Sequence, residues 1–397
     1  MSEGPYVNPA VVLQASGPNS VAIIRSLGRL GIPVIACDHD PRALGLLSRW
    51  VTPWFTRDAL ADPEGFTEDV LNLGRTLPAK GVLFPTHDEA IGALGPHEDA
   101  VAQFFHRPWS PWERMERTMD KSGQHAAARA IGFPVPLTVE PADAADAVAL
   151  SADMRFPVIL KPRLSPDFRK RFKTQVLECH DVEELRRNWE LAAPYEPQMS
   201  EVIPGGDELI WSLGSYRGAG GERWASFTGR KLRQYPTRFG TGRSAESHWD
   251  PEYAERCHAL LDELDFQGIS QLETKRDPRD GRDHLIEVNT RSWLWVGLAT
   301  AVGVNLPLAC YLDAIGSPRQ WPEGHRDGLR WVLATRHVGA AVGEIRRGQW
   351  TVPELLKTLR PPIREGVWDL RDLRPGIGQT TRQMRAIAGK LARRRGG

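Results

Sequence analysis

An acid, an amide and a guanidinium occupy every second position of one short apolar stretch of the chain. The stretch is LIEVNTRSW, residues 285–293, and the three polar residues are Glu287, Asn289 and Arg291. In a β-strand, alternate side chains share a face and lie roughly 6.6 Å apart, so these three should project together. The remaining apolar residues of the stretch indicate a central, buried strand; they are Leu285, Ile286, Val288 and Trp293. Because a buried charge needs a partner or a metal ion, this face is a candidate for chemistry rather than a solvated face held by a salt bridge.

A second acid should join this face across a hairpin. LETKR and HLIEVNTR flank the turn DPRDG (277–281), which predicts two antiparallel strands with Glu273 on the partner strand. Glu273, Glu287 and Asn289 offer only oxygen ligands, which suit Mg²⁺, and protein-bound Mg²⁺ usually completes its shell with water and nucleotide phosphates. Arg291 beside such a site suits a phosphoryl group in transfer.

Two lysines and one linker could supply the remaining contacts of a nucleotide. The P-loop pattern G-x-x-x-x-G-K-[ST] does not occur in the sequence. Lys161 lies within the apolar strand FPVILKP, where an ammonium group needs an anion, and Lys121 begins a predicted helix. The segment SEVIPGGDE (200–208) offers backbone N–H and C=O groups to the edge of adenine, and Glu208 follows Glu201 at a spacing that suits the ribose hydroxyls.

The first part of the chain predicts a small doubly wound α/β domain. VVLQAS and IPVIACDHD read as buried strands joined by a helix that ends at Gly31, and the alternation of strand and helix continues to about residue 118. The loop after the first strand lacks G-x-G-x-x-G, which argues against dinucleotide binding. After the strand GVLFP, Thr86 or Asp88 could cap the next helix, or His87 or Asp88 could contact a substrate.

The composition of the whole chain excludes several classes of protein. With 397 residues, 41% hydrophobic and 25% charged, and a net charge of +1, the chain predicts a multidomain globular protein that does not bind polyanions by bulk charge. Basic and aromatic residues do not interleave as nucleic-acid recognition requires. Four separated cysteines without a C-x-x-C pair argue against a structural zinc site and against a disulfide framework, and they indicate a reducing, cytoplasmic setting.

Two apolar segments could be mistaken for membrane or export signals. The N-terminus lacks the basic region that precedes the apolar core of a secretory signal. The run 294–312 contains Asn305 and Pro307, and it predicts a buried pair of helices rather than a membrane span.

Residues 317–397 predict a C-terminal helical extension with a basic tail. The tail, RQMRAIAGKLARRRGG, carries six basic residues and no acid. A solvated, frayed helix would explain this composition, and so would weak contact with an anionic surface such as a membrane leaflet. Both interpretations are compatible with the sequence.

Taken in order, these segments resemble the ATP-grasp superfamily across roughly residues 10–316. The DK pair with its helix and GFPVPLT is similar to the entry segment of that family, FPVILKPR to its phosphate-lysine strand, EVIPGGDE to its adenine hinge and ribose glutamate, and LETKRDPRDGRDHLIEVNTR to its paired magnesium acids. FTGRKLRQYPTRFGTG (227–242) is similar to a carboxylate–amine ligase branch that includes D-aspartate ligase. The resemblance implies an α/β protein with the ATP-grasp fold, in which residues 1–118 form a doubly wound parallel-sheet domain. Residues 119–316 would form the ATP-grasp domain, with an antiparallel sheet and a small α+β lid at about 135–199.

The resemblance also implies a role for each site residue. Lys121 and Lys161 would bind the ATP phosphates, backbone groups of Glu201, Val202 and Ile203 would bind adenine, Glu208 the ribose, and Glu273, Glu287 and Asn289 one or two Mg²⁺ ions, for which Mn²⁺ could substitute. Arg291 would stabilise an acyl phosphate, and Lys231 and Arg233 would hold the acceptor carboxylate or the γ-phosphate. Ser200 departs from the family pattern, which often has Gln before the hinge glutamate, so the adenine geometry could differ.

The activity that the resemblance implies is ATP-dependent ligation of a small-molecule carboxylate to an amine. The carboxylate, from an amino acid or a similar metabolite, would be activated as an acyl phosphate, and the products would be an amide, ADP and phosphate. The alternative is a non-catalytic ATP-binding or regulatory protein with the same fold. Its sequence mark would be loss of a metal acid or a phosphate lysine, and both kinds of residue are retained. Homodimers are common in the superfamily.

Overall fold

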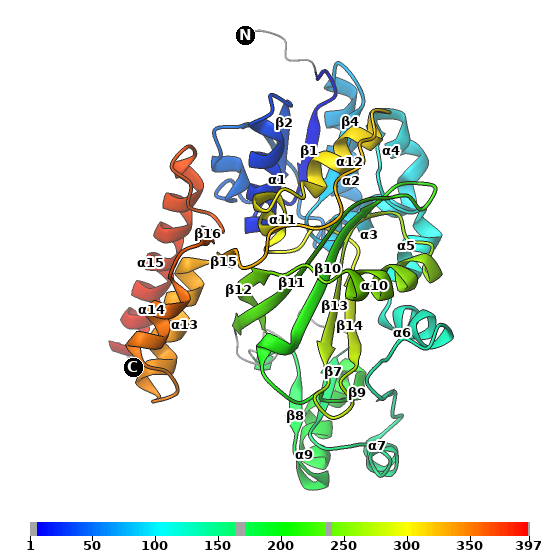
Figure 1. Cartoon of the computed structure of the whole chain (residues 1–397), viewed down its shortest axis with the longest axis vertical. Coiled ribbons are helices and arrows are strands. Elements are labelled where there is room, and N and C mark those ends of the chain that lie inside the picture. Colours follow the sequence, from blue (N-terminus) through cyan, green and yellow to red (C-terminus); the bar gives the residue numbers. More distant parts are fainter. Residues whose placement is uncertain (1–5, 163–167, 169–170, 173, 236–239, 396–397) are drawn as a thin grey trace.

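The computed structural model describes residues 6–395 apart from residues 163–167, 169–170, 173 and 236–239. Figure 1 shows a parallel-sheet region at the top, a long central sheet beneath it, a small sheet at the bottom and a group of C-terminal helices at one side. Along the chain, the strands of the parallel sheet come first, those of the small sheet second and the long strands of the central sheet third, and the C-terminal helices follow.

The N-terminal sheet is parallel and doubly wound, as predicted. Its strands are β1 (Ala10–Leu13), β2 (Val34–Asp38), β3 (Val51–Phe55), β4 (Gly81–Pro85) and β5 (Phe105–His106), in the spatial order β3-β2-β1-β4-β5. The helices between and after the strands are α1 (Pro18–Gly28), α2 (Pro63–Thr76), α3 (Asp88–Leu94) and α4 (Glu98–Phe104). The sequence did not predict β3, because Pro53 interrupts its pattern; as an edge strand, β3 can tolerate a residue without an N–H group.

The central sheet carries the predicted hairpin. Its order is β14-β13-β10-β11-β12-β15-β16, and the long strands are β10 (Ile210–Arg217), β11 (Arg223–Tyr235), β12 (Thr241–Ser247), β13 (Gly268–Arg276) and β14 (Asp283–Asn289). These strands pair antiparallel throughout. The helices α5 (Trp112–Met119), α6 (Lys121–Ala130) and α10 (Pro251–Glu263) belong to this part of the chain, and α6 begins at Lys121 as predicted.

The small sheet lies below the central sheet in Figure 1 and has the order β6-β9-β7-β8. Its strands are β6 (Thr138–Val139), β7 (Val158–Pro162), β8 (Leu177–Cys179) and β9 (Pro197–Glu201), all antiparallel, and the helices α7 (Ala144–Ser151) and α9 (Val182–Ala192) accompany them. Helix α7 is capped by Asp143 and α9 by Asp181, whose carboxylates accept backbone N–H groups of the first turn. This composition is the α+β one expected of the segment.

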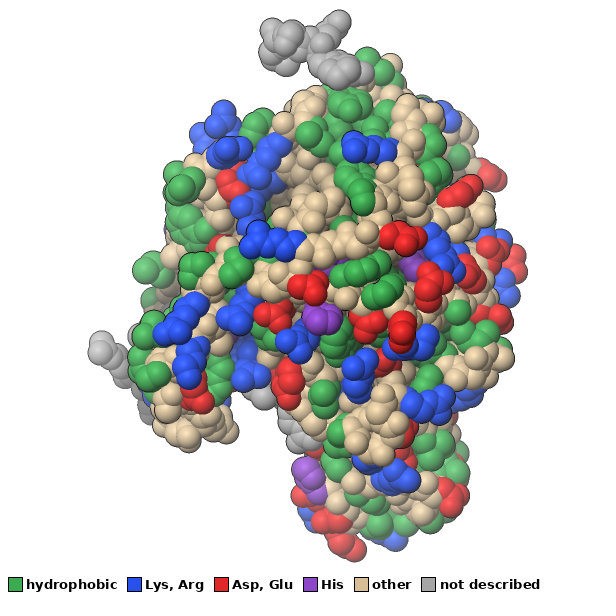
Figure 2. Space-filling view, in the orientation of Figure 1, with side chains coloured by type: hydrophobic (Ala, Val, Ile, Leu, Met, Phe, Trp, Pro, Cys, Tyr) green, Lys and Arg blue, Asp and Glu red, His purple; other side chains and the backbone are tan. Residues whose placement is uncertain are grey.

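The C-terminal segment is less purely helical than the sequence predicts. Helices α13 (Ala334–Arg346), α14 (Val352–Thr358) and α15 (Leu373–Arg395) form a group at one side of the molecule (Figure 1). Strands β15 (Arg330–Val332) and β16 (Ile363–Glu365) extend the central sheet beyond β12. Three-residue strands give too short an alternation to be predicted. On the face shown in Figure 2, basic side chains gather over the C-terminal helices and acidic ones over α10.

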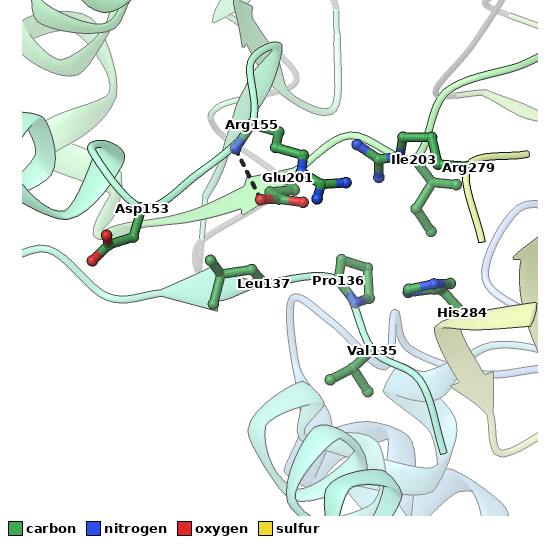
Figure 3. A pocket seen from close by; sticks show the side chains of 9 residues that line it. All are labelled: Val135, Pro136, Leu137, Asp153, Arg155, Glu201, Ile203, Arg279 and His284. Carbon is green, nitrogen blue, oxygen red and sulfur yellow. Dashed lines mark hydrogen bonds between the residues drawn. The ribbon is translucent and has the colours of Figure 1, made fainter. Parts of the chain in front are cut away.

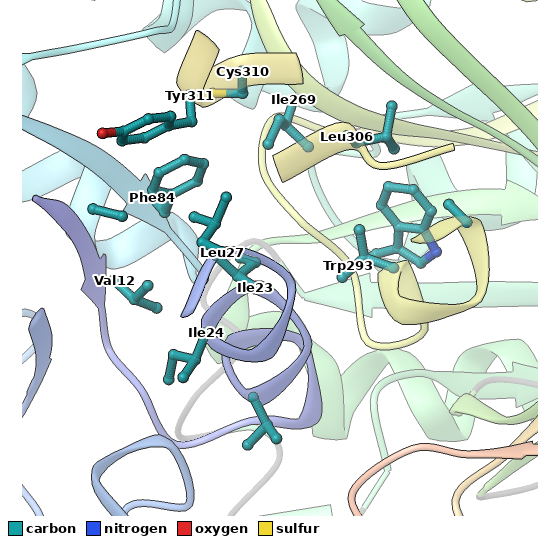
Figure 4. Packing of buried hydrophobic residues seen from close by; sticks show 14 of the residues in the cluster. Val12, Ile23, Ile24, Leu27, Phe84, Ile269, Trp293, Leu306, Cys310 and Tyr311 are labelled. Carbon is teal, nitrogen blue, oxygen red and sulfur yellow. The ribbon is translucent and has the colours of Figure 1, made fainter. Parts of the chain in front are cut away.

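The N-terminal domain shares its core with the central sheet. In one cluster, Val12, Ile23 and Phe84 pack with Ile269, Trp293 and Tyr311 (Figure 4). In a second cluster, Val11 and Leu13, on the opposite face of β1, pack with residues that include Leu285 and Val288 of β14. The small sheet has a core cluster of its own, which includes Leu160, Leu185 and Trp189. The N-terminal domain and central sheet are therefore joined by apolar packing on both faces of β1, whereas the small sheet has separate packing.

The apolar run 294–312 forms two short helices, α11 (Val296–Ala301) and α12 (Leu306–Ala314), as predicted. Asn305 caps α12 by accepting the N–H of Leu308. Within the described part of the chain, no helix is both long enough and apolar enough to cross a membrane.

A buried ion pair fixes the C-terminal segment to α1. Arg25 donates from Nε to Asp372 at 3.0 Å, and its two terminal nitrogens donate to the carbonyls of Val367 and Asp372. The two side chains are 7% and 1% exposed, and Ser48 also donates to the Asp372 carboxylate. Removing one partner of such a pair leaves the other buried without its counter-charge.

We expect Arg25→Met to lower the free energy of unfolding by about 3–5 kcal/mol, the usual loss when a buried ion pair is broken. The matched control is Arg382→Met, which removes an exposed pair between α15 and Asp40 and should change stability by about 1 kcal/mol or less. Denaturant unfolding of both variants provides the measurement. Equal losses in the two variants would contradict the importance of burial.

Candidate functional site

A bulge in β14 aims the predicted acids into one site. Glu273 of β13 faces Glu287 of β14, but the next residue, Thr274, faces Leu285, so Ile286 has no partner across the ladder. Bulges of this kind re-aim side chains beside active sites. The prediction that Ile286 packs in the core beside Val288 is therefore wrong: Val288 is buried, whereas Ile286 is only half-buried.

Three lysines from three parts of the chain surround the two glutamates. Lys231 of β11 donates to Glu273 at 2.7 Å, with both side chains buried, and Lys121 at the start of α6 lies 3.6 Å from Glu287. Lys161 of β7 is close enough to Lys121 and Glu287 for their charges to act on it. The structure thus brings together five of the predicted residues, which would carry one more positive than negative charge if all five were ionised.

The pKa values of the group reflect this balance. Burial alone would raise the pKa of Glu287, but Lys121, Lys161 and Lys231 outweigh it and lower the pKa to about 2. Burial is the main reason why the pKa of Glu273 is raised; Lys231 opposes the shift and Glu287 adds to it. Burial and then the neighbouring Lys121 lower the pKa of Lys161 to about 7, against the attraction of Glu287. The site therefore holds a firmly ionised carboxylate beside a lysine that is ready to gain a proton.

Gln271 is a site residue that the sequence did not reveal. It faces Asn289 across the hairpin, and its amide donates to Ser212 at 3.0 Å and to Glu273 at 3.3 Å. Asn289 donates to Glu287 at 3.1 Å and to the Gln271 oxygen at 3.3 Å. Position 271 lies two residues before Glu273, so it shares the site face, and this spacing was the signal available in the sequence.

The carboxylates and the Asn289 oxygen fit a divalent cation. Glu273 and Glu287 face each other on neighbouring strands, Asn289 is on the same face, and every donor atom that they offer to a metal is oxygen. This set matches the chemistry of Mg²⁺. One group of three metal-ligating side chains occurs elsewhere in the described residues, Asp277, Asp280 and His284 at the hairpin turn. Asp277 is already paired with Arg279, and Asp280 with His284.

The segment that joins β9 to β10 has the features of a hinge. The backbone N–H of Glu201 donates to Leu137 and that of Val202 to Pro157. The Glu201 carboxylate accepts the backbone N–H of Arg155 at 2.9 Å, and Lys275 of β13 donates to the carbonyl of Ile203 at 2.8 Å. Among the described residues, none pairs with the backbone N–H of Ile203. That N–H group is therefore available to a ligand, whereas the Glu201 side chain is engaged within the small sheet.

A cavity of about 310 Å³ lies beside this hinge (Figure 3). Glu201, Ile203 and Arg155 line it together with His284 and Arg279 from the hairpin. The dashed line in Figure 3 marks the bond from the Arg155 backbone to Glu201. The lining residues do not include Lys121, Lys161, Glu273 or Glu287, so the cavity is distinct from the charged cluster.

The structure places Lys231 and Arg233, the two basic residues expected to hold the acceptor carboxylate or the γ-phosphate, in different surroundings. β11 is irregular here, because Lys231 faces Ala245 whereas Arg233 faces Ser244, which leaves Leu232 as an extra residue. Lys231 joins the acids, whereas Arg233 lies 3.8 Å from Glu208 and stacks over Trp350 of the C-terminal segment. The bulge separates two side chains that a regular strand would place on one face.

Glu208 is half-exposed and remains accessible beside Arg233. Its neighbour Asp207 is buried instead and accepts from the backbone and side chain of Gln234. Of the two adjacent acids, Asp207 has a structural role and Glu208 is the one available to a ligand.

Arg291 is tied to the N-terminal domain. Its guanidinium donates to Asp88 at 3.1 Å and to the carbonyl of Ser292, whereas its buried Nε has no partner among the described residues. Asp88 and Thr86 do not cap α3, contrary to one of the sequence-based alternatives. Gln14 supplies the cap, since its side-chain oxygen accepts the N–H of Ala90 at 3.1 Å. The sequence could not reveal this contact, because Gln14 is 76 residues away from Ala90.

Comparisons with known proteins agree with this architecture. No family model matches the sequence. The D-aspartate ligase of Enterococcus faecium (strain Aus0004) is 25% identical over an alignment of 274 residues that covers 64% of this chain and 63% of that protein. The chain thus matches less than two thirds of the length of this relative.

Several solved structures share the fold over most of the chain. An ADP complex of N5-carboxyaminoimidazole ribonucleotide synthetase has a TM-score of 0.65 at 12% identity and covers 87% of each chain. The L-amino acid ligase from Bacillus licheniformis has a TM-score of 0.61 at 16% identity and covers 81% of this chain and 77% of its own. The biotin carboxylase domain of the Hydrogenobacter thermophilus 2-oxoglutarate carboxylase, crystallised with MgADP, ADP and bicarbonate, has a TM-score of 0.62 at 17% identity over 81% of this chain and 73% of its own. With its parallel N-terminal domain, inserted small sheet and central antiparallel sheet, the chain has the ATP-grasp fold.

Proposed function

We propose that the protein is an ATP-dependent ligase that joins a carboxylate to an amine through an acyl phosphate. The observation that carries the proposal is the facing pair of Glu273 and Glu287 among three lysines drawn from α6, β7 and β11. Such a cluster can bind a polyphosphate chain together with its cation. The similarity to a D-aspartate ligase and to an L-amino acid ligase supports an amino acid as one substrate.

The proposed chemistry follows from the weakness of a carboxylate as an electrophile. Transfer of the γ-phosphoryl group gives an acyl phosphate, and attack by an amine then forms the amide and releases phosphate. Lys121 and Lys161 would hold the ATP phosphates, and Arg291 would stabilise charge on the acyl phosphate. Mg²⁺ held by Glu273, Glu287 and Asn289 would neutralise phosphate charge. The backbone of Glu201, Val202 and Ile203 would bind adenine, with the free N–H of Ile203 as a donor, and Glu208 would bind the ribose.

We propose that residues of about 135–199, which include most of the small sheet, act as a lid. Their separate core allows them to move as a unit, and Lys161 on β7 would travel with them. Closure would bring Lys161 onto the phosphates and exclude the water that hydrolyses an acyl phosphate. In this proposal residues 1–118 contribute to the acceptor site. Arg233, held against Trp350, would bind an anionic group of a substrate.

We also propose a reducing, cytoplasmic setting for the reaction, because the four cysteines are free and buried. One of the three structural neighbours named above is described as a domain dimer, and we extend the proposal to a homodimer on that ground. Weak contact of the basic tail with an anionic surface such as a membrane leaflet stays a prediction.

An activity screen tests the proposed function. Purified protein is incubated with ATP, Mg²⁺ and a panel of amino acids and other carboxylates, each with hydroxylamine or with a panel of amines. Hydroxylamine converts an acyl phosphate to a hydroxamate, which is detected by colour and mass. We expect at least one carboxylate to give a hydroxamate and one amine to give an amide. ATP binding in calorimetry without hydroxamate from any carboxylate would favour the non-catalytic alternative.

Glu287→Gln should lower hydroxamate formation by about 10²–10³-fold or more, because it removes the carboxylate that binds the metal while keeping the side-chain shape. The matched control is Glu263→Gln at the exposed end of α10, which should retain wild-type rates. Circular dichroism should show that both variants are folded. Wild-type rates in Glu287→Gln would refute the metal assignment.

ATP binding should also take up a proton through Lys161. In the free protein the pKa of Lys161 is about 7, and the negative charge of bound phosphates raises it. Above pH 7 the complex therefore holds a proton on Lys161 that the free protein lacks. We expect uptake of nearly one proton at pH 8, and an affinity for ATP that falls by up to about tenfold per pH unit above pH 7. Calorimetry in buffers of different protonation enthalpy measures the uptake.

The control variants for proton uptake are Lys161→Met and Lys80→Met. Lys161→Met should abolish both the uptake and this part of the pH dependence. Lys80→Met replaces a lysine that donates to the carbonyl of Ala102 in the N-terminal domain, and it should change neither. Unaltered uptake in Lys161→Met would assign the proton to another group.

A further inference from the structure

Two side chains of the N-terminal domain, His87 and Asp88, lie near Arg291, and the proposed function assigns neither of them a role. His87 and Asp88 follow β4 at the carboxyl edge of the parallel sheet. β1 lies in the middle of that sheet, with β2 on one side and β4 on the other, so the loops after β1 and β4 flank the point where the strand order reverses. Open α/β sheets bind ligands at this point.

The loop that carries His87 is fixed from both sides. The buried Thr86 donates its hydroxyl proton to the carbonyl of Gln14 at 2.6 Å, and its own carbonyl accepts from Asn19 of α1 at 3.0 Å. Gln14 has a φ of +56°, a left-handed conformation that costs a residue with a side chain some energy. The same Gln14 caps α3 through Ala90. The cap therefore leaves Asp88 free to face Arg291.

The hydrogen bonds at Thr86 determine the tautomer of His87. Nδ1 of His87 lies 2.9 Å from the Thr86 hydroxyl oxygen. Because that hydroxyl gives its proton to a backbone carbonyl, it must accept from His87, so Nδ1 carries the ring proton. Nε2 then has a free lone pair and, within the described residues, no partner. Burial and then the charge of Arg291 lower the pKa of His87, against Glu89 and Asp88, so the neutral ring prevails at pH 7.

Charge and position suit a cationic group at this place. Asp88 is about half-exposed, so it can bind a further group while it contacts Arg291. In the proposed function Arg291 stabilises the acyl phosphate, and its buried Nε lacks a partner among the described residues. The N-terminal domain and the central sheet share an apolar core, so the contact between Asp88 and Arg291 joins two parts that are packed together.

We propose that Asp88 binds the ammonium group of the acceptor beside Arg291, and that Nε2 of His87 removes its proton. The inference rests on the proposed function. The ammonium group loses one proton to Nε2, which gives an imidazolium ion and a neutral amine. The amine lone pair then forms the C–N bond at the acyl carbon, and the bond from that carbon to the phosphate oxygen breaks. Phosphate leaves with the bonding electrons, and the amide nitrogen sheds its second proton to solvent.

Comparison of two nucleophiles on one enzyme preparation tests the inference. Hydroxylamine is largely neutral at pH 7 and needs no base, whereas an aliphatic amine is protonated. We expect His87→Gln to lower amide formation by about 10²-fold or more, as loss of a general base does, and to lower hydroxamate formation at least tenfold less. The amide rate of the variant should rise about tenfold per pH unit as solvent deprotonates the amine. Since a misfolded fraction lowers both products alike, the ratio of the two rates is insensitive to folding.

Further variants separate binding from proton transfer. Asp88→Asn should raise the KM for the amine more than it lowers kcat. His97→Gln and Asp99→Asn change the same residue types on the same domain away from Arg291, and both should keep the wild-type ratio. Equal losses of amide and hydroxamate in His87→Gln, or no loss of either, would overturn the inference and leave the proposed function standing. Failure of the wild-type protein to form any hydroxamate would overturn the proposed function and this inference with it.

Discussion

Glu273 and Glu287 repel each other across adjacent strands of a largely buried sheet, and the lysines of the site offset their negative charge. Two carboxylates in such a place can both ionise only if positive charge lies close to each. Lys231 supplies it for Glu273 from within the same sheet, and Lys121 and Lys161 supply it for Glu287 from a helix and from the small sheet. The position of the small sheet, which carries Lys161, therefore affects the pKa of Glu287 in the central sheet. A cation with a polyphosphate would take over the same balance when bound.

The parts of this site that could be predicted from the sequence are those encoded by short local patterns. The alternation in LIEVNTRSW, the turn DPRDG and the lysine inside an apolar strand each depend on a few neighbouring residues. The doubly wound domain could also be predicted from local patterns, since buried parallel strands and the helices between them have a strong hydrophobic periodicity. Its edge strand β3 escaped detection because Pro53 breaks the strand pattern where no hydrogen bond is needed.

What could not be predicted depends on register and on contacts between distant segments. One extra residue at Ile286 and another at Leu232 decide which side chains reach the acids, and no local signal marks either bulge. For the same reason, the sequence does not show that Lys231 and Arg233 have different partners. Capping of α3 by Gln14 requires the fold to exist first, and the sequence suggested nearer residues for the task. The two short strands of the C-terminal segment form only because β12 offers them an edge.

The separate core of the small sheet has a consequence for how the molecule loses structure. The N-terminal domain and the central sheet are packed together on both faces of β1, so they should lose structure as one cooperative unit. The small sheet holds itself together around Leu160 and Trp189, so it can lose its packing while the larger unit stays native. Natural variation in that small core would then change how often the site is complete rather than whether the protein is folded. Such variation could tune turnover without threatening the stability of the rest of the chain.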